Sequence, residues 1–149
     1  MCYSYSVVIY MNYDFEKFHY TTDSEHNITY INFSKAHAAA DSVITLHSVK
    51  RDDPQINVDI FHDGRLAGIE ILSFDKYLPK LVLQEMGSRS SGKLTLTLLS
   101  DYIIFDNSDT LEPVSQTTLR SSLNDLEARC LFSSQGVLVG IKFSEAVRF

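Results

Sequence analysis

Acidic side chains gather in one short stretch of the sequence, between residues 56 and 72. Asp59, Asp63 and Glu70 fall within it, and carboxylates this close together can bind a cation or act as a general base. Their spacing lacks the D-x-[DN]-x-[DN]-G pattern of a calcium-binding loop, and Asp63 precedes a glycine, as turn residues do. We therefore expect a solvated acidic face that meets a partner, and no metal site.

The other residue types that commonly do chemistry are scattered along the chain. The two cysteines, Cys2 and Cys130, match no metal-binding spacing and are expected to be reduced thiols. No serine lies in a G-x-S-x-G pattern, and the run RSSGK lacks the correctly placed first glycine of a phosphate-binding loop. The histidines show no H-x-x-x-H or H-x-H spacing; they are His19, His26, His37, His47 and His62. We expect no catalytic residue, no cofactor and no metal.

The acidic stretch is predicted to be a β-hairpin, INVDIFHDGRLAGIEIL. Two runs rich in Ile, Val and Leu flank Asp63-Gly64, a pair that suits a two-residue type I′ turn. Such a turn places apolar residues opposite one another on one face: Ile56 with Ile71, Val58 with Ile69, and Ile60 with Ala67. The mixed face pairs Asn57 with Glu70, Asp59 with Gly68, and Phe61 with Leu66. One face should therefore pack on a core and leave the carboxylates outward.

Alternating apolar and polar residues predict strands along most of the remaining chain. The segment SFDKYLPKLVLQEMG predicts one short helix near residues 74–86, which Gly87 ends, and SRSSGK at 88–93 is typical of a linker. The predicted strands are CYSYSVVIY near the N-terminus, ITYINFS, VITLHSV, LTLTLL, DYIIFD, QTTLRSS and a second hairpin, ARCLFSSQGVLVGIKF. The expected fold class is α+β and mostly β, with a twisted antiparallel sheet or two packed sheets.

The second hairpin repeats the first at an offset of 72 residues. This offset relates Gly64 to Gly136 and Gly68 to Gly140, and it relates the YI-x-F run beginning at Tyr30 to an equal run 72 residues later. Gly68 and Gly140 lie inside strands, where glycine lowers stability and indicates a bulge or a close backbone approach. We predict a single domain over residues 1–149, built from two repeats (about 20–87 and about 92–149) with an added N-terminal strand in 1–20.

The segments YTTDSEHNITYINFS and DIFHDGRLAGIEIL, within residues of about 20–80, resemble a small uncharacterised bacterial domain family of unknown function. Its members share the pattern D-x-D-G-[RK]-[LIV]-x-G-[IF]-E-[IV]-L. The resemblance implies a compact sheet followed by a helix, but it implies no activity and no catalytic residues. The second half matches only through GVLVGIKF, so it resembles a diverged copy of the same domain in tandem.

Charge limits the class of partner. The formal net charge is −6, and an acidic surface repels phosphate backbones, so we expect no nucleic acid partner and favour a basic protein. Residues 1–87 hold twelve acidic against seven basic residues, and residues 88–149 hold seven against six. No signal peptide or membrane-spanning run is evident in the sequence, so a cytoplasmic protein without membrane contact is expected.

We expect a non-enzymatic protein-binding protein, and more specifically a bacterial immunity or antitoxin-like protein that neutralises a cognate toxin by direct contact. A small acidic chain without catalytic motifs suits a basic toxin domain, because complementary charge speeds capture and excludes wrong partners. The predicted contact residues are Asp52, Asp53, Asp59, Asp63 and Glu70, with Tyr3 and Tyr5 as aromatic anchors.

Two alternatives remain open at this point. A small-ligand-binding or enzymatic domain would hold its ligand in a cleft between the two repeats, where Asp59 or Glu70 would act as a general base. A structural subunit would form a homo-oligomer by pairing edge strands.

Overall fold

The computed structural model describes residues 14–33, 43–108, 110–122 and 125–147. These residues form ten strands and two helices. The strands are β1 (Asp14–Asp23), β2 (Ile28–Asn32), β3 (Val43–Ser48), β4 (Ile56–Phe61), β5 (Leu66–Leu72), β6 (Ser91–Leu99), β7 (Tyr102–Ile104), β8 (Ser115–Arg120), β9 (Glu127–Phe132) and β10 (Leu138–Phe143). The helices are α2 (Phe74–Tyr77) and α3 (Lys80–Met86). The predicted strand CYSYSVVIY lies outside the described residues.

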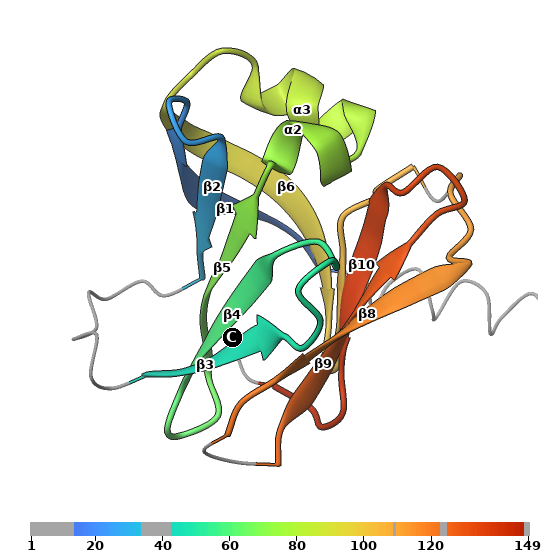
Figure 1. The fold of residues 1–149 in the computed structure, drawn as a ribbon. Coiled ribbons are helices and arrows are strands. Elements are labelled where there is room, and N and C mark those ends of the chain that lie inside the picture. Colours follow the sequence, from blue (N-terminus) through green and yellow to red (C-terminus); the bar gives the residue numbers. More distant parts are fainter. Residues whose placement is uncertain (1–13, 34–42, 109, 123–124, 148–149) are drawn as a thin grey trace, which may run out of the picture.

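The strands form one closed antiparallel barrel (Figure 1). Their order is β1-β2-β5-β4-β3-β8-β9-β10-β7-β6, and β6 pairs back onto β1. The predicted mostly β, antiparallel fold is confirmed. The sheet closes on itself through two pairings between distant parts of the chain, β1 with β6 and β3 with β8. Closure satisfies backbone groups that an open sheet would leave unpaired at its two edges.

The first hairpin, β4–β5, has the predicted register over most of its length. Ile56 pairs with Ile71, Val58 with Ile69, Asn57 with Glu70 and Asp59 with Gly68. The predicted pairs of Ile60 with Ala67 and of Phe61 with Leu66 are wrong, because a bulge shifts the register and Ile60 pairs with Leu66. A bulge adds one residue to one strand, so the partners beyond it change by one position.

The turn of this hairpin also differs from the predicted type I′ turn. That turn needs positive φ at both central residues, and Asp63 does not have one, whereas Gly64 has φ 90°. The Gly64 N–H donates to the Phe61 carbonyl at 2.9 Å, and the Phe61 N–H donates to the Arg65 carbonyl at 2.8 Å. These bonds close a three-residue loop, in which only the glycine must adopt the left-handed conformation.

The predicted single helix is divided in two by Pro79. Leu78 has ψ 144°, an extended conformation, because a proline ring disfavours the helical region for the residue before it. The second of the two helices, α3, ends at Gly87 as predicted, with φ 60° and an N–H that donates to the Leu83 carbonyl at 2.9 Å.

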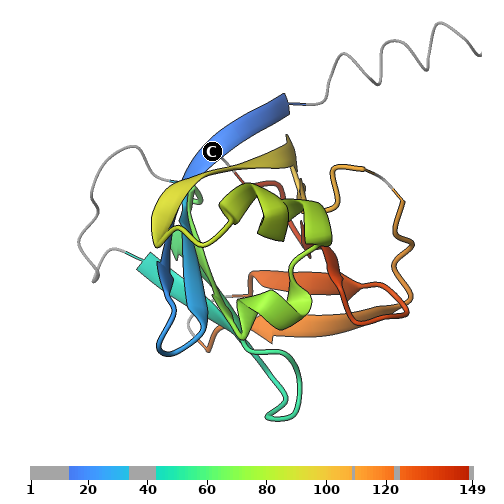
Figure 2. The ribbon, with the colours of Figure 1, turned by 90° about the horizontal axis from the view of Figure 1, so that it is seen from above.

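Both helices lie over one end of the barrel (Figure 2). The buried Tyr20 hydroxyl of β1 donates to the carbonyl of Met86, the last residue of α3, at 3.1 Å. The Glu85 carboxylate accepts bonds from the backbone N–H and the hydroxyl of Thr95 on β6. The helices are therefore tied to the β1–β6 side of the barrel.

The predicted linker at 88–93 is only partly outside the sheet. Ser91, Gly92 and Lys93 belong to β6, and Gly92 pairs with Tyr20. A Cβ added to Gly92 would lie 3.1 Å from the Tyr20 hydroxyl oxygen, so a glycine makes room for this ring. β1 itself runs beyond the predicted N-terminal strand to Asp23, with Phe18 and Tyr20 buried.

The second half of the chain repeats the strand order of the first half: β6-β7-β10-β9-β8 corresponds to β1-β2-β5-β4-β3. The pair Tyr30–Glu70 in the first half has its equivalent in Tyr102–Lys142, at the 72-residue offset noted in the sequence. The bulge recurs between Leu138 and Gly140. The turn recurs as well, because the Gly136 N–H donates to the Ser133 carbonyl at 2.9 Å and Gly136 has φ 79°.

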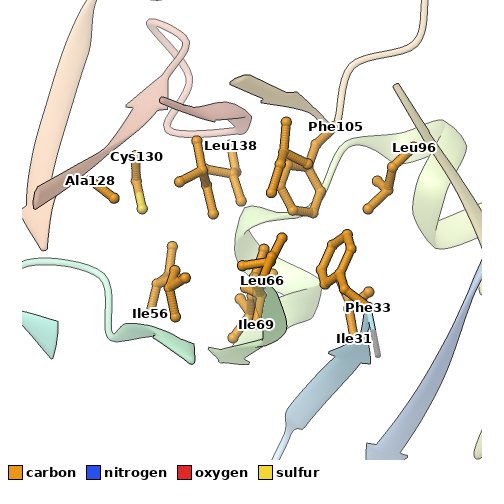
Figure 3. Packing of buried hydrophobic residues seen from close by; sticks show 14 of the residues in the cluster. Ile31, Phe33, Ile56, Leu66, Ile69, Leu96, Phe105, Ala128, Cys130 and Leu138 are labelled. Carbon is orange, nitrogen blue, oxygen red and sulfur yellow. The ribbon is translucent and has the colours of Figure 1, made fainter. Parts of the chain in front are cut away.

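One apolar core lies between the two halves (Figure 3). In that view Ile56 and Leu66 of the first half face Cys130 and Leu138 of the second half. All four are at most 1% exposed. Because residues alternate between the two faces of a strand, the neighbours of these core residues point outward, away from the other half.

Candidate functional site

The predicted contact residues fall in three separate places. Asp59 on β4 and Glu70 on β5 point outward from the same face of the first half. Asp52 and Asp53 lie in the loop between β3 and β4, before the hairpin begins. Asp63 lies at the opposite end of the hairpin, where it forms an ion pair with Arg65 at 2.8 Å. The structure therefore brings Asp59 and Glu70 together, but not the other three.

Tyr3 and Tyr5, the predicted aromatic anchors, lie outside the described residues. Their role stays a prediction.

Asp59 and Glu70 belong to two neighbouring rows of outward-pointing side chains. One row crosses the sheet through His47, Asn57, Glu70 and Tyr30, and the next row begins with Thr45 and Asp59. We call the outward surface of these residues the acidic face; its members are Tyr30, Thr45, His47, Asn57, Asp59 and Glu70.

Hydrogen bonds hold Glu70 in place on the acidic face. The Asn57 Nδ2 donates to Glu70 Oε1 at 2.8 Å. The Asn57 Oδ1 can only accept, so the His47 Nδ1, 3.0 Å away, donates to it. A chain of two bonds across three strands thus fixes the carboxylate of Glu70. Among the described residues no hydrogen bond to its other oxygen, Oε2, is found, so a partner can bind there.

Asp59 is held by a second set of bonds. The Thr45 hydroxyl donates to Asp59 Oδ1 at 2.6 Å, and the Tyr30 hydroxyl donates to Asp59 Oδ2 at 3.3 Å. Burial raises the pKa of Tyr30 well above its usual value, and the charge of Asp59 raises it further. Tyr30 therefore keeps its proton and remains a hydrogen-bond donor at neutral pH.

Gly68 provides the space in which the Tyr30 ring lies. A Cβ added to Gly68 would lie 1.9 Å from the Tyr30 hydroxyl oxygen, closer than any real contact. In the second half, a Cβ added to Gly140 would lie 2.4 Å from Cε1 of Tyr102. The bulge, one of the two features predicted for a strand glycine, is found beside both of them. The other, a close backbone approach, is found at Gly140, where an added Cβ would lie 2.7 Å from the Ile103 carbonyl oxygen. Tyr30 and Tyr102 were not among the predicted contact residues. The strand glycines that make room for their rings were the only sequence signal for their position.

The equivalent surface of the second half has the opposite charge. There, Thr118, Arg129, Lys142 and Tyr102 form the first outward row, and Gln116 and Leu131 begin the second. We call this surface the basic face; its members are Tyr102, Gln116, Thr118, Arg129, Leu131 and Lys142. Arg129 and Lys142 replace Asn57 and Glu70, and both are exposed.

Among the residues that the structure describes, one cluster of potential metal ligands occurs outside these faces. Asp23, Glu25 and His26 lie in the exposed turn between β1 and β2, with ligand atoms within 4.8 Å of one another. The Asp23 carboxylate accepts the backbone N–H groups of Glu25 and His26 at 3.1 and 3.2 Å. The hydrogen bond from the His26 side chain lowers the pKa of Asp23. These bonds are those of a capped turn.

Cys130 is a core residue. It pairs with Ile141, as the repeat predicted, and it is 0% exposed. Burial raises the pKa of the Cys130 thiol, so the group stays protonated and is unsuited to nucleophilic attack.

The fold and its outer faces define a class of protein: a closed antiparallel β barrel whose two halves share a strand order and differ in surface charge. Residues 18–74 match a family described as a protein of unknown function, DUF2283. The matched stretch runs from β1 to the start of α2 and contains the whole acidic face. A comparison with curated proteins and one with solved structures each found no match. No helix among the described residues is long and apolar enough to cross a membrane.

Proposed function

We propose that this chain is a non-enzymatic protein-binding protein that recognises a basic partner through the acidic face. The observation that carries the proposal is the fixed position of two outward carboxylates, Asp59 and Glu70. Each accepts hydrogen bonds from neighbouring strands, and among the described residues neither forms an ion pair.

Fixed side chains favour binding for an energetic reason. A partner that binds a flexible surface must order its side chains, which costs about 0.5–1.5 kcal/mol of binding free energy for each side chain immobilised. Asp59 and Glu70 are already held by Thr45, Tyr30 and Asn57, so this cost is reduced. Tyr30 adds an aromatic ring to the same surface, and tyrosine is enriched among residues that dominate binding energy.

Charge supports a basic partner. Residues 1–87 carry twelve acidic and seven basic residues, a net of −5, whereas residues 88–149 carry a net of −1. The field around the first half therefore attracts a cationic protein and speeds its capture, an effect that weakens as salt increases.

In its more specific form, the proposal is that the protein acts in the cytoplasm as an immunity or antitoxin-like protein, as in contact-dependent growth inhibition. Its partner would be a basic toxin domain that acts on an anionic substrate. The acidic face would compete with that substrate for the toxin. We also propose that the second half is a diverged copy of the domain matched at 18–74, because strand order, bulge and turn recur at one offset.

The test is co-expression with the product of the reading frame beside its gene, scoring growth and co-purification. The wild-type chain should restore growth and form a stable stoichiometric complex. The double variant Asp59→Asn/Glu70→Gln should lose both, because it removes two charges from the acidic face. The matched control Glu112→Gln/Asp125→Asn removes two exposed charges from the second half and should behave as wild type.

Two outcomes contradict the proposal. Unrelieved toxicity with no complex for the wild-type chain overturns the immunity function. Equal rescue by the Asp59→Asn/Glu70→Gln variant and its control would keep a protein partner but remove the acidic face as its binding site.

A further inference from the structure

The two outer faces lie on equivalent strands and carry opposite charges. The acidic face carries two formal negative charges, on Asp59 and Glu70, and the basic face carries two positive charges, on Arg129 and Lys142. Since the core lies between the halves, the faces point to opposite sides of the molecule (Figure 3). One molecule therefore presents a negative surface on one side and a positive surface on the other.

The basic face contains an unfavourable pair. Arg129 lies directly opposite Lys142 across β9 and β10, and like charges in such positions destabilise a sheet. Neither residue forms an ion pair with any described residue. The equivalent pair in the first half, Asn57 and Glu70, is joined by a hydrogen bond of 2.8 Å. Carboxylates brought between Arg129 and Lys142 from outside would remove the repulsion.

The acidic face has the geometry to supply those carboxylates. Asp59 and Glu70 are diagonal neighbours on adjacent strands, which corresponds to roughly 7–8 Å between backbone positions. Arg129 and Lys142 are direct neighbours, at about 5 Å, and their long side chains can spread to span the difference.

We propose that the basic face of one molecule docks on the acidic face of a second copy of this chain. The contact is head-to-tail, because the two faces are different and point in opposite directions. A pair of molecules still has one free face of each sign, so the assembly grows with concentration. Self-association covers Asp59 and Glu70 and thereby competes with any basic partner for the acidic face.

The contact uses the acidic face of the proposed function but does not require that function, since it is measured on the purified protein alone. Sedimentation equilibrium of the full chain at about 0.15 M salt should show a mass that rises with concentration up to about 1 mM, the weak end of specific association. At about 1 M salt the Debye length falls to about 3 Å, and the mass should return to that of the monomer.

Complementation between variants tests the pairing directly. Arg129→Glu/Lys142→Glu loses the basic face, and Asp59→Asn/Glu70→Gln loses the charge of the acidic face. Each variant alone should remain monomeric. An equimolar mixture should form a discrete dimer, because each variant keeps the face that the other lacks.

The control Lys50→Glu/Lys80→Glu has the same net charge as the Arg129→Glu/Lys142→Glu variant, but its changes lie on an exposed loop and on α3. This control should retain concentration-dependent self-association. The Arg129→Glu/Lys142→Glu variant should self-associate with a Kd at least about 10-fold higher than that of the wild-type chain. If circular dichroism shows that the Asp59→Asn/Glu70→Gln variant is poorly folded, Glu70→Gln alone replaces it in the mixing experiment.

Three results would overturn the proposal. One is a monomer at every concentration of the wild-type chain. Another is self-association that persists in both face variants, as pairing of strand edges would give. The last is a mixture of the two variants that stays monomeric although both are folded.

Discussion

The acidic and basic faces occupy equivalent places in the barrel, yet their side chains behave differently. On the acidic face, Asn57 and His47 position Glu70, and Thr45 and Tyr30 position Asp59. On the basic face, Arg129 and Lys142 face each other with no ion-pair partner among the described residues. The same backbone therefore carries one surface that is organised within the molecule and one that favours an external anion.

The inner sides of the two halves, by contrast, are closely alike. Ile69 and Ile141 occupy equivalent positions and are each 0% exposed. Replacing either with alanine should lower the free energy of unfolding by about 2–5 kcal/mol, because each leaves a cavity in the shared core. Urea unfolding followed by circular dichroism should show a single transition for both variants. Two transitions in the Ile141→Ala variant would contradict a shared core.

A smaller and unequal effect is expected at the strand glycines. Gly140→Ala should cost about 3 kcal/mol and Gly68→Ala about 1 kcal/mol, within the range for overpacking. At Gly140 the added Cβ would lie 2.7 Å from the Ile103 carbonyl oxygen, a backbone atom that cannot move aside. At Gly68 the close atoms belong to the Tyr30 ring, which can rotate away.

Double variants separate these two causes. Tyr30→Ala should remove most of the penalty of Gly68→Ala, whereas Tyr102→Ala should leave much of the penalty of Gly140→Ala. Equal relief in both halves would show that the backbone contact at Gly140 is unimportant. Chemical denaturation of the four single and two double variants gives the coupling energies.

The smallest effect concerns Tyr30 on the acidic face. Burial and Asp59 raise the pKa of Tyr30 in the folded state, so its stabilising contribution is present below the unfolded pKa of about 10 and is lost as the pH rises above it. Tyr30→Phe should lower stability at pH 7 by about 1 kcal/mol through the lost bond to Asp59 and should reduce the alkaline loss.

The matched control is Tyr30→Phe in an Asp59→Asn background, because that background lacks the charge of Asp59. The Cys130 thiol, whose pKa is also raised, contributes equally in both backgrounds and cancels in the comparison. Stability curves from pH 7 to pH 11 that Tyr30→Phe changes by the same amount in the two backgrounds would contradict the role given to Asp59.

Local pattern was sufficient to predict both hairpins, and it gave the register of β4 with β5 from the Ile56–Ile71 pair to the Asp59–Gly68 pair. Alternation in β4 and β5 defines which face is apolar, and Gly64 marks the turn. Alternation did not place the bulge, because Ala67 fits either face, although glycine at position 68 had indicated a bulge or a close backbone approach. Closure of the barrel was also beyond local pattern, since the β1–β6 and β3–β8 pairings join segments whose sequences contain no signal for each other.

The candidate site was predicted only in part for the same reason. Asp59 and Glu70 lie on one hairpin, so the register alone places them on one face. Their partners Tyr30 and Thr45 come from two other strands, and only the order of strands in the sheet brings them together. Asp63 was predicted to join them at one end of the hairpin, but it lies in the turn, where it forms an ion pair with Arg65.

Two strand pairings join the halves of the barrel, β1 with β6 and β3 with β8, and we call them its seams. The seams differ in length, and this has a consequence for dynamics. β1 pairs with β6 continuously from Asp14 to Thr21, whereas the described residues of β3 pair with β8 only at His47 and Ser48. Local opening should therefore begin at the β3–β8 seam, where few backbone bonds must break. His47 belongs to both that seam and the acidic face, so a bound partner would slow amide exchange there. Binding at one surface would thus be measurable as tighter closure of the barrel.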